Sequence, residues 1–445
     1  MQPYRDPEAE PDIVPVALRV RECADCGQFH WVPRLPPGAV ARCLRCNGVL
    51  RRGRRYPLQR PLALALAGLV LLVAAAKLPL MGVDFHGRSS DALLTTGPFT
   101  LTQDGLWTLG MVVLATTLAV PLVRMVCVSA VLAALHMRTR PRGLHVIFAW
   151  AETLRPWSMV EVYMLGIFVA YSRLVDMAYV ELGPAAYTLA GVMLLIAGMD
   201  AALDPGQVWE RLEQARLVAR PASLAASRAA LQAPRQTPAR LIGCRCCGLV
   251  VGAVAGARCP RCDSRLRARK PDSLDRTWAL LAAAAVLYIP ANTLPVMTVI
   301  SFGSGQPNTI LSGVQELAAR GMWPLAILVF FASITVPLLK LVGLSAMLLS
   351  VHRGARGRLR DRTRLYRVLV AIGRWSMIDI FMLSILVGLV RMGVLASVRP
   401  GLGAVSFCAV VILTMLAAMA FDPRLMWDAA GRGGRMSTPG MSIRA

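Results

Sequence analysis

The sequence predicts an α-helical polytopic membrane protein, formed by tandem duplication of a four-cysteine ribbon followed by four transmembrane helices, eight helices in total. Three observations predict this fold: long uncharged apolar runs, two sets of paired CxxC motifs, and a second half that repeats the first at a nearly constant offset. Hydrophobic residues make up 56% of the 445 residues and charged residues only 17%. Soluble domains carry about 25% charged residues, so the composition favours a membrane protein.

The apolar runs have the length of membrane-spanning helices. Runs such as 62–76, 278–303 and 402–421 contain no charged residue, and about 20 apolar residues are enough to cross the hydrocarbon core. Buried helices of a soluble protein are the alternative, which eight such segments in one chain disfavour. We expect the eight helices at about 61–83, 105–135, 157–178, 185–203, 276–300, 321–351, 374–395 and 402–421.

Prolines mark special points in these helices. The second helix of each half is long, and Pro121 or Pro337 can kink it. Leu78-Pro79 and Leu294-Pro295 close the first helix of each half. A simple helix end and a substrate gate are both compatible with these Leu-Pro pairs.

The formal charge of +24 follows the membrane topology. Lys and Arg are concentrated in 204–277 and 351–374. Alternate connections are poor in them, namely 82–104, 173–184, 301–320 and 396–401. This alternation is the positive-inside pattern. It predicts that both termini and both ribbons are cytoplasmic, with the basic segments facing anionic headgroups, and it disfavours nucleic acid as the partner. The polar opening MQPYRDPEAEPDIVP is unlike a cleavable signal peptide.

An internal repeat covers most of the chain. At an offset of 216, Cys43 maps onto Cys259 and Pro121 onto Pro337; at 218, Trp157-Ser158-Met159 maps onto Trp375-Ser376-Met377. Each half contains an even number of spans, so the halves share one orientation about an axis near the membrane normal. The expected domains are a disordered 1–20, ribbon 21–56, transmembrane unit 57–210, linker 211–240, ribbon 241–270, transmembrane unit 271–428 and a disordered tail 429–445.

Each ribbon carries two CxxC turns. Four thiolates on two facing turns are typical of a structural Zn²⁺ site with no open coordination position. Disulfides or a redox CxxC are the alternative, disfavoured in a reducing cytoplasm. The expected ligands are Cys23, Cys26, Cys43 and Cys46 in the first ribbon and Cys244, Cys247, Cys259 and Cys262 in the second.

Ionisable residues occur inside the predicted spans, where they are costly and commonly functional. Arg124 and Lys340 each follow the kink proline by three residues, and Glu161 and Asp379 begin the third helix of each half. Structural ion pairs with snorkelling side chains are an equally weighted interpretation. Because Lys can lose its proton when buried and Arg practically cannot, the second half is the better candidate for a functional site.

The whole arrangement resembles the paraquat-inducible protein A (PqiA) family and its LetA-like members. The resemblance rests on both ribbons, the Leu-Pro pairs, Pro337-Leu338-Leu339-Lys340, the two Trp-Ser-Met motifs and the Asp-Pro exits at Asp204 and Asp422. It implies a bacterial inner-membrane protein with a periplasmic MCE-domain partner that forms a homo-oligomeric tunnel, and phospholipid as cargo. It also implies a polar network, which here would comprise Ser333, Lys340, Ser376, Asp379, Thr414 and Glu161.

Three functions compete at this stage. The first is a lipid-transport subunit that loads or unloads an MCE tunnel between the inner and outer membranes. The second is a non-transporting scaffold whose ribbons recruit cytoplasmic partners, and the third is a stress-linked small-molecule exporter. We expect no enzyme, and no P-loop motif is present.

Overall fold

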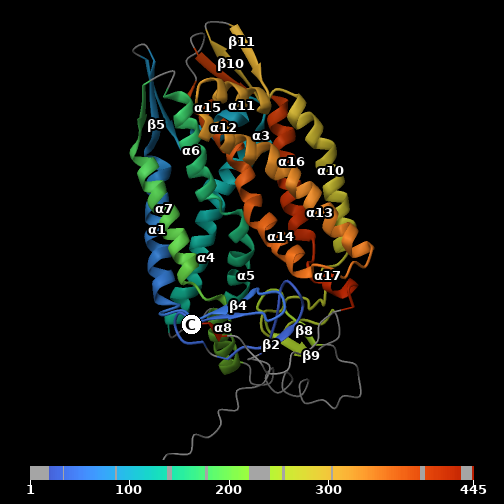
Figure 1. Cartoon of the computed structure of the whole chain (residues 1–445). Coiled ribbons are helices and arrows are strands. Elements are labelled where there is room, and N and C mark those ends of the chain that lie inside the picture. Colours follow the sequence, from blue (N-terminus) through green and yellow to red (C-terminus); the bar gives the residue numbers. More distant parts are fainter. Residues whose placement is uncertain are drawn as a thin grey trace, which may run out of the picture. The chain divides into compact units, whose positions relative to one another are not determined.

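The computed structural model in Figure 1 describes residues 20–33, 35–85, 88–137, 143–175, 179–219, 241–252, 256–301, 304–390, 396–431 and 443–444. These residues form two compact units. The first takes its described residues from 20–55, 205–268 and 443–444, and the second from 56–204 and 269–431. The expected N-terminal segment and much of the expected linker and tail lie outside the described residues.

The first unit contains both ribbons and one helix. Short antiparallel hairpins build the ribbons, since β1 pairs with β2, β3 with β4, and β8 with β9. The bounds are β1 Val20–Glu22, β2 Phe29–Trp31, β3 Val40–Arg42, β4 Val49–Arg52, α8 Pro205–Ala219, β8 Leu241–Gly243, β9 Val250–Gly252 and β13 Ile443–Arg444. Val20, Phe29 and Val250 form a shared apolar cluster, so the two ribbons pack against each other.

The second unit is a helical bundle made from two similar halves. The first half comprises α1 Gln59–Lys77, β5 Pro79–Phe85, β6 Arg88–Leu93, α2 Thr96–Gln103, α3 Trp107–Leu114, η2 Ala115–Ala119, α4 Val120–His136, α5 Leu144–Leu154, η3 Arg155–Trp157, α6 Val160–Leu174, β7 Tyr179–Leu182 and α7 Pro184–Ala202.

The second half repeats this order. It comprises α10 Ser273–Thr293, β10 Met297–Ser301, β11 Ser304–Asn308, α11 Ile310–Ala319, α12 Trp323–Phe330, η4 Phe331–Thr335, α13 Val336–His352, α14 Leu359–Ile372, η5 Gly373–Met377, α15 Ile378–Leu389, β12 Ala396–Pro400, α16 Leu402–Ala420 and α17 Arg424–Ala429. Helix α1 packs along α7, and α10 packs along α16 in the same way.

Within the described residues, seven helical stretches are long and apolar enough to cross a membrane. They are 59–77, 107–136, 184–202, 273–293, 323–352, 359–389 and 402–420. The remaining expected span, at 157–178, corresponds to α6, which has only 15 residues. In the second half α14, η5 and α15 run on without a break, whereas in the first half Ser158 and Met159 separate η3 from α6. The chain is therefore a multi-pass helical membrane protein.

A π-helical segment precedes each expected kink proline. Segments η2 and η4 end two residues before Pro121 and Pro337. A π turn inside an α-helix accommodates the hydrogen bond that a proline cannot donate. Thr117 and Ser333, which correspond in the repeat, each donate a hydroxyl hydrogen bond of 2.7 Å to the carbonyl four residues earlier. The two long helices thus stay continuous through their prolines.

Two small sheets lie at one end of the bundle (Figure 1). Strand β5 pairs antiparallel with β6 and β7, and β10 pairs likewise with β11 and β12. Leu78 and Leu294 are the C-caps of α1 and α10, with ψ of 151° and 150°. The extended backbone leads directly into the strands, so the Leu-Pro pairs are helix ends. Sequence analysis treated these segments as connections and missed the sheets, because β5 finds its partner β7 about a hundred residues later.

The two halves meet where α6 packs against α15. Tyr163 and Phe381, which correspond to each other in the repeat, form an edge-to-face ring contact with centroids 5.5 Å apart. Equivalent residues that touch must lie near the axis relating the halves. Every residue of α15 is buried, so this helix is the centre of the bundle.

Helix α2 of the first half crosses α15 at backbone contact. A Cβ on Gly97 would lie 2.2 Å from the Ser384 carbonyl oxygen, and one on Gly388 would lie 2.7 Å from the Gly97 Cα. Only glycine fits such a crossing.

The Gly97→Ala variant should therefore lose about 1–3 kcal/mol of stability, as overpacked cores do. Thermal unfolding of the purified protein in detergent measures this as a lower Tm. Gly198→Ala is the matched control, because its Cβ would meet Leu64 Cδ1 at an ordinary 3.4 Å. Equal Tm values for the two variants would contradict the assigned crossing.

Candidate functional site: paired metal centres and buried membrane polar groups

Each ribbon brings four cysteines together. The Sγ atoms of each set lie within 4.8 Å of one another, and all eight residues are buried. Sγ–Sγ distances are 3.4 Å for Cys23–Cys46, 3.5 Å for Cys26–Cys43, 3.5 Å for Cys244–Cys262 and 3.6 Å for Cys247–Cys259. A tetrahedral Zn²⁺ with Zn–S bonds of about 2.3 Å requires sulfurs about 3.8 Å apart, so both sets can hold a metal.

The knuckles have one shared backbone design. In each CxxC turn the amide of the residue after the second cysteine donates to the carbonyl of the first cysteine, at 2.8–2.9 Å. That residue has a φ of 58–70°, in the left-handed region. Glycine, asparagine and aspartate tolerate this conformation best. The four positions are Gly27, Asn47, Gly248 and Asp263.

Two polar side chains touch the thiols from outside the ligand sets, and sequence analysis missed both. His30 Nε2 lies 3.1 Å from Cys43 Sγ, and Ser264 Oγ lies 3.0 Å from Cys262 Sγ and 3.2 Å from Cys244 Sγ. Hydrogen bonding among the neighbouring thiols, together with burial, raises the pKa of Cys26 and of Cys247. Metal binding at either site must therefore release protons.

The ribbons and α8 form one module rather than two independent fingers. Glu22 Oε2 accepts a hydrogen bond of 2.9 Å from the Gly243 amide of the other ribbon. On α8, Glu210 pairs with Arg51 at 2.9 Å, and Glu213 pairs with Arg261. Arg261 lies inside a metal knuckle and is buried, so it is satisfied by Glu213 and is not presented to a nucleic acid or a headgroup.

The second half of the bundle holds a buried lysine network. Lys340 Nζ donates to the Gly373 carbonyl and to Ser376 Oγ, both at 2.9 Å, and to Thr414 Oγ1 at 3.3 Å. Lys340, Ser376 and Thr414 are at most 1% exposed. A Cβ on Gly373 would lie 3.2 Å from Lys340 Cε, so glycine there lets the lysine approach the backbone. Three of the residues expected in a polar network are thus joined.

In the first half the equivalent buried cation, Arg124, is held by a carboxylate. Arg124, which is 2% exposed, pairs with Asp200 on α7, and Arg155 pairs with the same carboxylate at 3.4 Å. Sequence analysis considered Glu161 as a neighbour of Arg124. Glu161 is only half-buried, and no ion pair joins it to another described residue. The sequence does contain a signal that could have identified Asp200 as the partner of Arg124. Asp200 is a carboxylate that lies one helical turn before the Asp204-Pro205 pair.

The duplicated positions explain this difference between the halves. At the offset of 218, Asp200 corresponds to Ala418 and Arg155 to Gly373. The second half therefore lacks the carboxylate that neutralises Arg124 in the first. Instead, Lys340 is surrounded by neutral hydrogen-bond acceptors among the described residues.

Asp379 is a second buried charge in the second half, on α15. It is 6% exposed, and neither of its carboxylate oxygens has a hydrogen-bond partner among the described residues. The Ser333 hydroxyl, on η4, donates to the Val329 carbonyl. Neither Ser333 nor Asp379 is thus joined to the lysine network by a hydrogen bond among the described residues.

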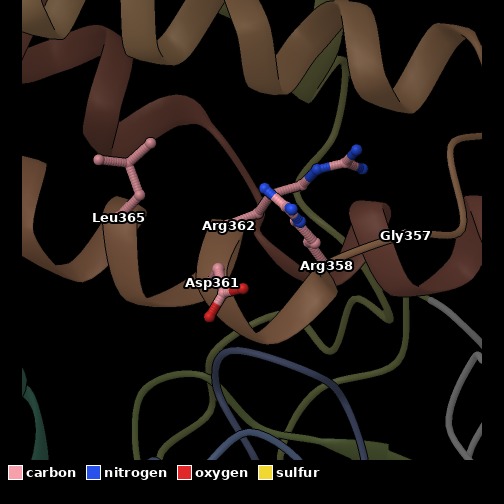
Figure 2. A pocket seen from close by; sticks show the side chains of 5 residues that line it. All are labelled: Gly357, Arg358, Asp361, Arg362 and Leu365. Atoms are coloured by element: carbon pink, nitrogen blue, oxygen red, sulfur yellow. The ribbon is translucent and has the colours of Figure 1, made fainter.

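A surface pocket at the start of α14 is lined by Gly357, Arg358, Asp361, Arg362 and Leu365. Figure 2 shows Arg358 and Arg362 side by side, with the Asp361 side chain apart from them. None of these five residues is buried. This pocket is an exposed basic depression, and the buried polar groups are better candidates for a functional site.

The comparison with known proteins agrees with the duplicated fold. The paraquat-inducible protein A family matches residues 58–213 and 274–431, one match for each half. The chain is 35% identical over 416 residues to the intermembrane transport protein PqiA of Escherichia coli K12, covering 91% of this chain and 95% of the relative. It is 32% identical to the lipophilic envelope-spanning tunnel protein A of the same strain, covering 93% and 92%.

A probable intermembrane transport protein of Haemophilus influenzae is 26% identical, over 92% of this chain and 96% of the relative. No solved structure matches the chain. The names of these relatives describe transport proteins and not enzymes. The tandem match, the two cysteine clusters and the similarity along nearly the whole chain place this membrane protein in the paraquat-inducible protein A family.

Proposed function

We propose that the protein is the inner-membrane subunit of an MCE-protein system that transports lipids, chiefly phospholipids, between the inner and outer membranes. The relatives are intermembrane transport proteins, and one is named for a lipophilic tunnel across the envelope. The observation that carries the proposal is Lys340, a buried cation in a membrane bundle whose partners among the described residues are all neutral. Such residues commonly mark a transport path.

The proposed topology follows the charge pattern. Both termini and both ribbons lie in the cytoplasm, where thiols stay reduced. The two sheets then lie on the periplasmic side, where an MCE tunnel would dock. The proposed modules are the ribbons 21–56 and 241–270 and the transmembrane units 57–210 and 271–428. The 211–240 linker joins the first transmembrane unit to the second ribbon.

We further propose that the two cysteine clusters hold structural Zn²⁺ ions, and that the transport site uses Ser333, Lys340, Ser376, Asp379 and Thr414, with Glu161 in the first half. Four buried thiols per site favour zinc over the harder cations, which prefer oxygen ligands. A fully thiolate-ligated zinc supplies folding energy and leaves no position for a reacting water.

The purified protein should contain two zinc ions per chain, measured by elemental mass spectrometry. Cys43→Ser and Cys259→Ser should each remove one zinc, because each takes one ligand from one cluster. Cys246→Ser is the control, since Cys246 is half-buried and outside both clusters. Loss of zinc from the control, or full zinc in both ligand variants, would refute the assignment.

Lys340→Met should abolish lipid transport while leaving the Tm unchanged or higher. Replacing a buried charge with an apolar side chain of similar volume removes a desolvation cost. Arg124→Met, the matched change in the first half, should instead destabilise the protein by about 1–3 kcal/mol, because Asp200 loses its buried partner. Transport with purified components and thermal unfolding check both. Normal transport by Lys340→Met would exclude a role for the lysine in transport.

The protein should co-purify with an MCE-domain protein from the same genome when the two are co-expressed. Phospholipid should pass from donor vesicles containing this protein to acceptor vesicles only when the MCE protein is present. The scaffold alternative predicts co-purification without lipid transfer. Absence of both results would reject the proposed function.

A further inference from the structure

Glu22 connects the two cysteine clusters through the residues that precede their first cysteines. It directly precedes Cys23 of the first cluster, and its Oε2 accepts a hydrogen bond of 2.9 Å from the Gly243 amide. Gly243 directly precedes Cys244, the first cysteine of the second cluster. A Cβ on Gly243 would overlap Glu22 Oε2, so only glycine lets the carboxylate reach this backbone amide.

Arg21 makes a second contact of the same kind. Its Nη1 donates a hydrogen bond of 3.4 Å to the carbonyl of Cys247, the second cysteine of the other cluster. Gly248 follows Cys247 with a φ of 70°, and a Cβ there would overlap Arg21 Nη1. Glu210 on α8 pairs with Arg21 at 3.8 Å, which holds the guanidinium in this position. Both contacts from the first ribbon therefore end beside cysteines of the second cluster.

These contacts run in one direction, from the first ribbon to the second. An offset of 221 matches the first cysteines of the two clusters. At this offset Arg21 corresponds to Ile242, and Glu22 corresponds to Gly243. Neither isoleucine nor glycine has a polar side chain. The second cluster thus receives polar contacts that the equivalent residues cannot return to the first.

We propose that Arg21 and Glu22 are positioning residues of the second metal centre, and that the two centres bind zinc cooperatively for this reason. Groups that hydrogen-bond around a metal ligand fix its orientation, and losing them commonly lowers metal affinity about 10–100-fold. A metal held by Cys23 orders the backbone that carries Glu22, which in turn orders Gly243 beside Cys244. Coupling between two binding sites is reciprocal, so each filled centre raises the affinity of the other. The inference rests on the proposed zinc content and is independent of the proposed lipid transport.

Zinc retention by the full-length protein in detergent tests the coupling. The protein is equilibrated under reducing conditions with zinc buffers of decreasing free zinc, and bound zinc per chain is measured by elemental mass spectrometry. Cys43→Ser, which removes a ligand of the first centre, should release the zinc of the second centre at about 10–100-fold higher free zinc than wild type. Cys259→Ser should shift the zinc of the first centre by a similar factor, because the coupling is reciprocal.

Glu22→Met and Arg21→Met keep both ligand sets and remove the contacts between them. Each should raise the free zinc at which the chain loses its more weakly bound zinc by about tenfold. Glu22→Gln keeps an oxygen that can accept from the Gly243 amide, so it should retain zinc nearly as wild type does. Arg258→Met is the matched control and should behave like wild type. Arg258 adjoins a cysteine of the second cluster, but it pairs with Asp263 of its own ribbon at 2.7 Å and is exposed.

Release of the remaining zinc from Cys43→Ser and Cys259→Ser at the free zinc of wild type would overturn the proposal, because the centres would then be independent. Wild-type retention by both Glu22→Met and Arg21→Met would also overturn it, because these side chains would then carry no coupling. If Glu22→Met does not fold, Gly243→Ala breaks the same contact from the second ribbon, since its Cβ would displace the carboxylate. It should give the same shift. Purified protein without zinc would reject the proposed zinc content, whereas two zinc ions released independently would reject the coupling alone.

Discussion

Helix α15 is buried along its whole length, and the arrangement of both halves depends on that burial. It packs against α2 and α6 of the first half and continues from α14 through η5 in the second. Glycines permit the contacts: Gly97 and Gly388 where α2 crosses, and Gly166 where α6 lies against Phe381. Helices in a membrane associate through close packing and polar contacts rather than through exclusion of water. A central helix with small residues at its crossings satisfies this requirement.

The duplication explains why the two halves share one arrangement of helices. The sequence differences between the halves explain where a functional site can lie. In the first half, Arg124 is neutralised by Asp200 on the adjacent helix, which makes a structural ion pair. In the second half the equivalent of Asp200 is Ala418, and Lys340 is held by two hydroxyls and a carbonyl. A lysine held by neutral groups can change its protonation or its partners at lower cost than a paired arginine.

The two ribbons form a module that depends on metal ligation and on contacts with α8. Each buries four thiols that a metal would organise, and direct contacts between the ribbons join them through Glu22 and the Gly243 amide. Helix α8, which follows α7 along the chain, carries one carboxylate for each ribbon, Glu210 and Glu213. Small domains of this kind have too little apolar core to fold alone and rely on metal ligation. The shared helix couples the order of one ribbon to that of the other.

Sequence alone determined the membrane class, the duplication, the eight cysteine positions and the place of Lys340 inside a predicted span, because apolar run length, CxxC spacing and a constant offset are local or periodic signals. Tertiary structure decided what spacing cannot encode. The β5–β7 and β10–β12 pairings and Asp200 as the partner of Arg124 all join residues distant in the chain. His30 and Ser264 come close to the thiols only in the folded ribbons. A charged residue inside a predicted span indicates from the sequence that burial carries a desolvation cost. Only the folded chain decides which group neutralises that charge.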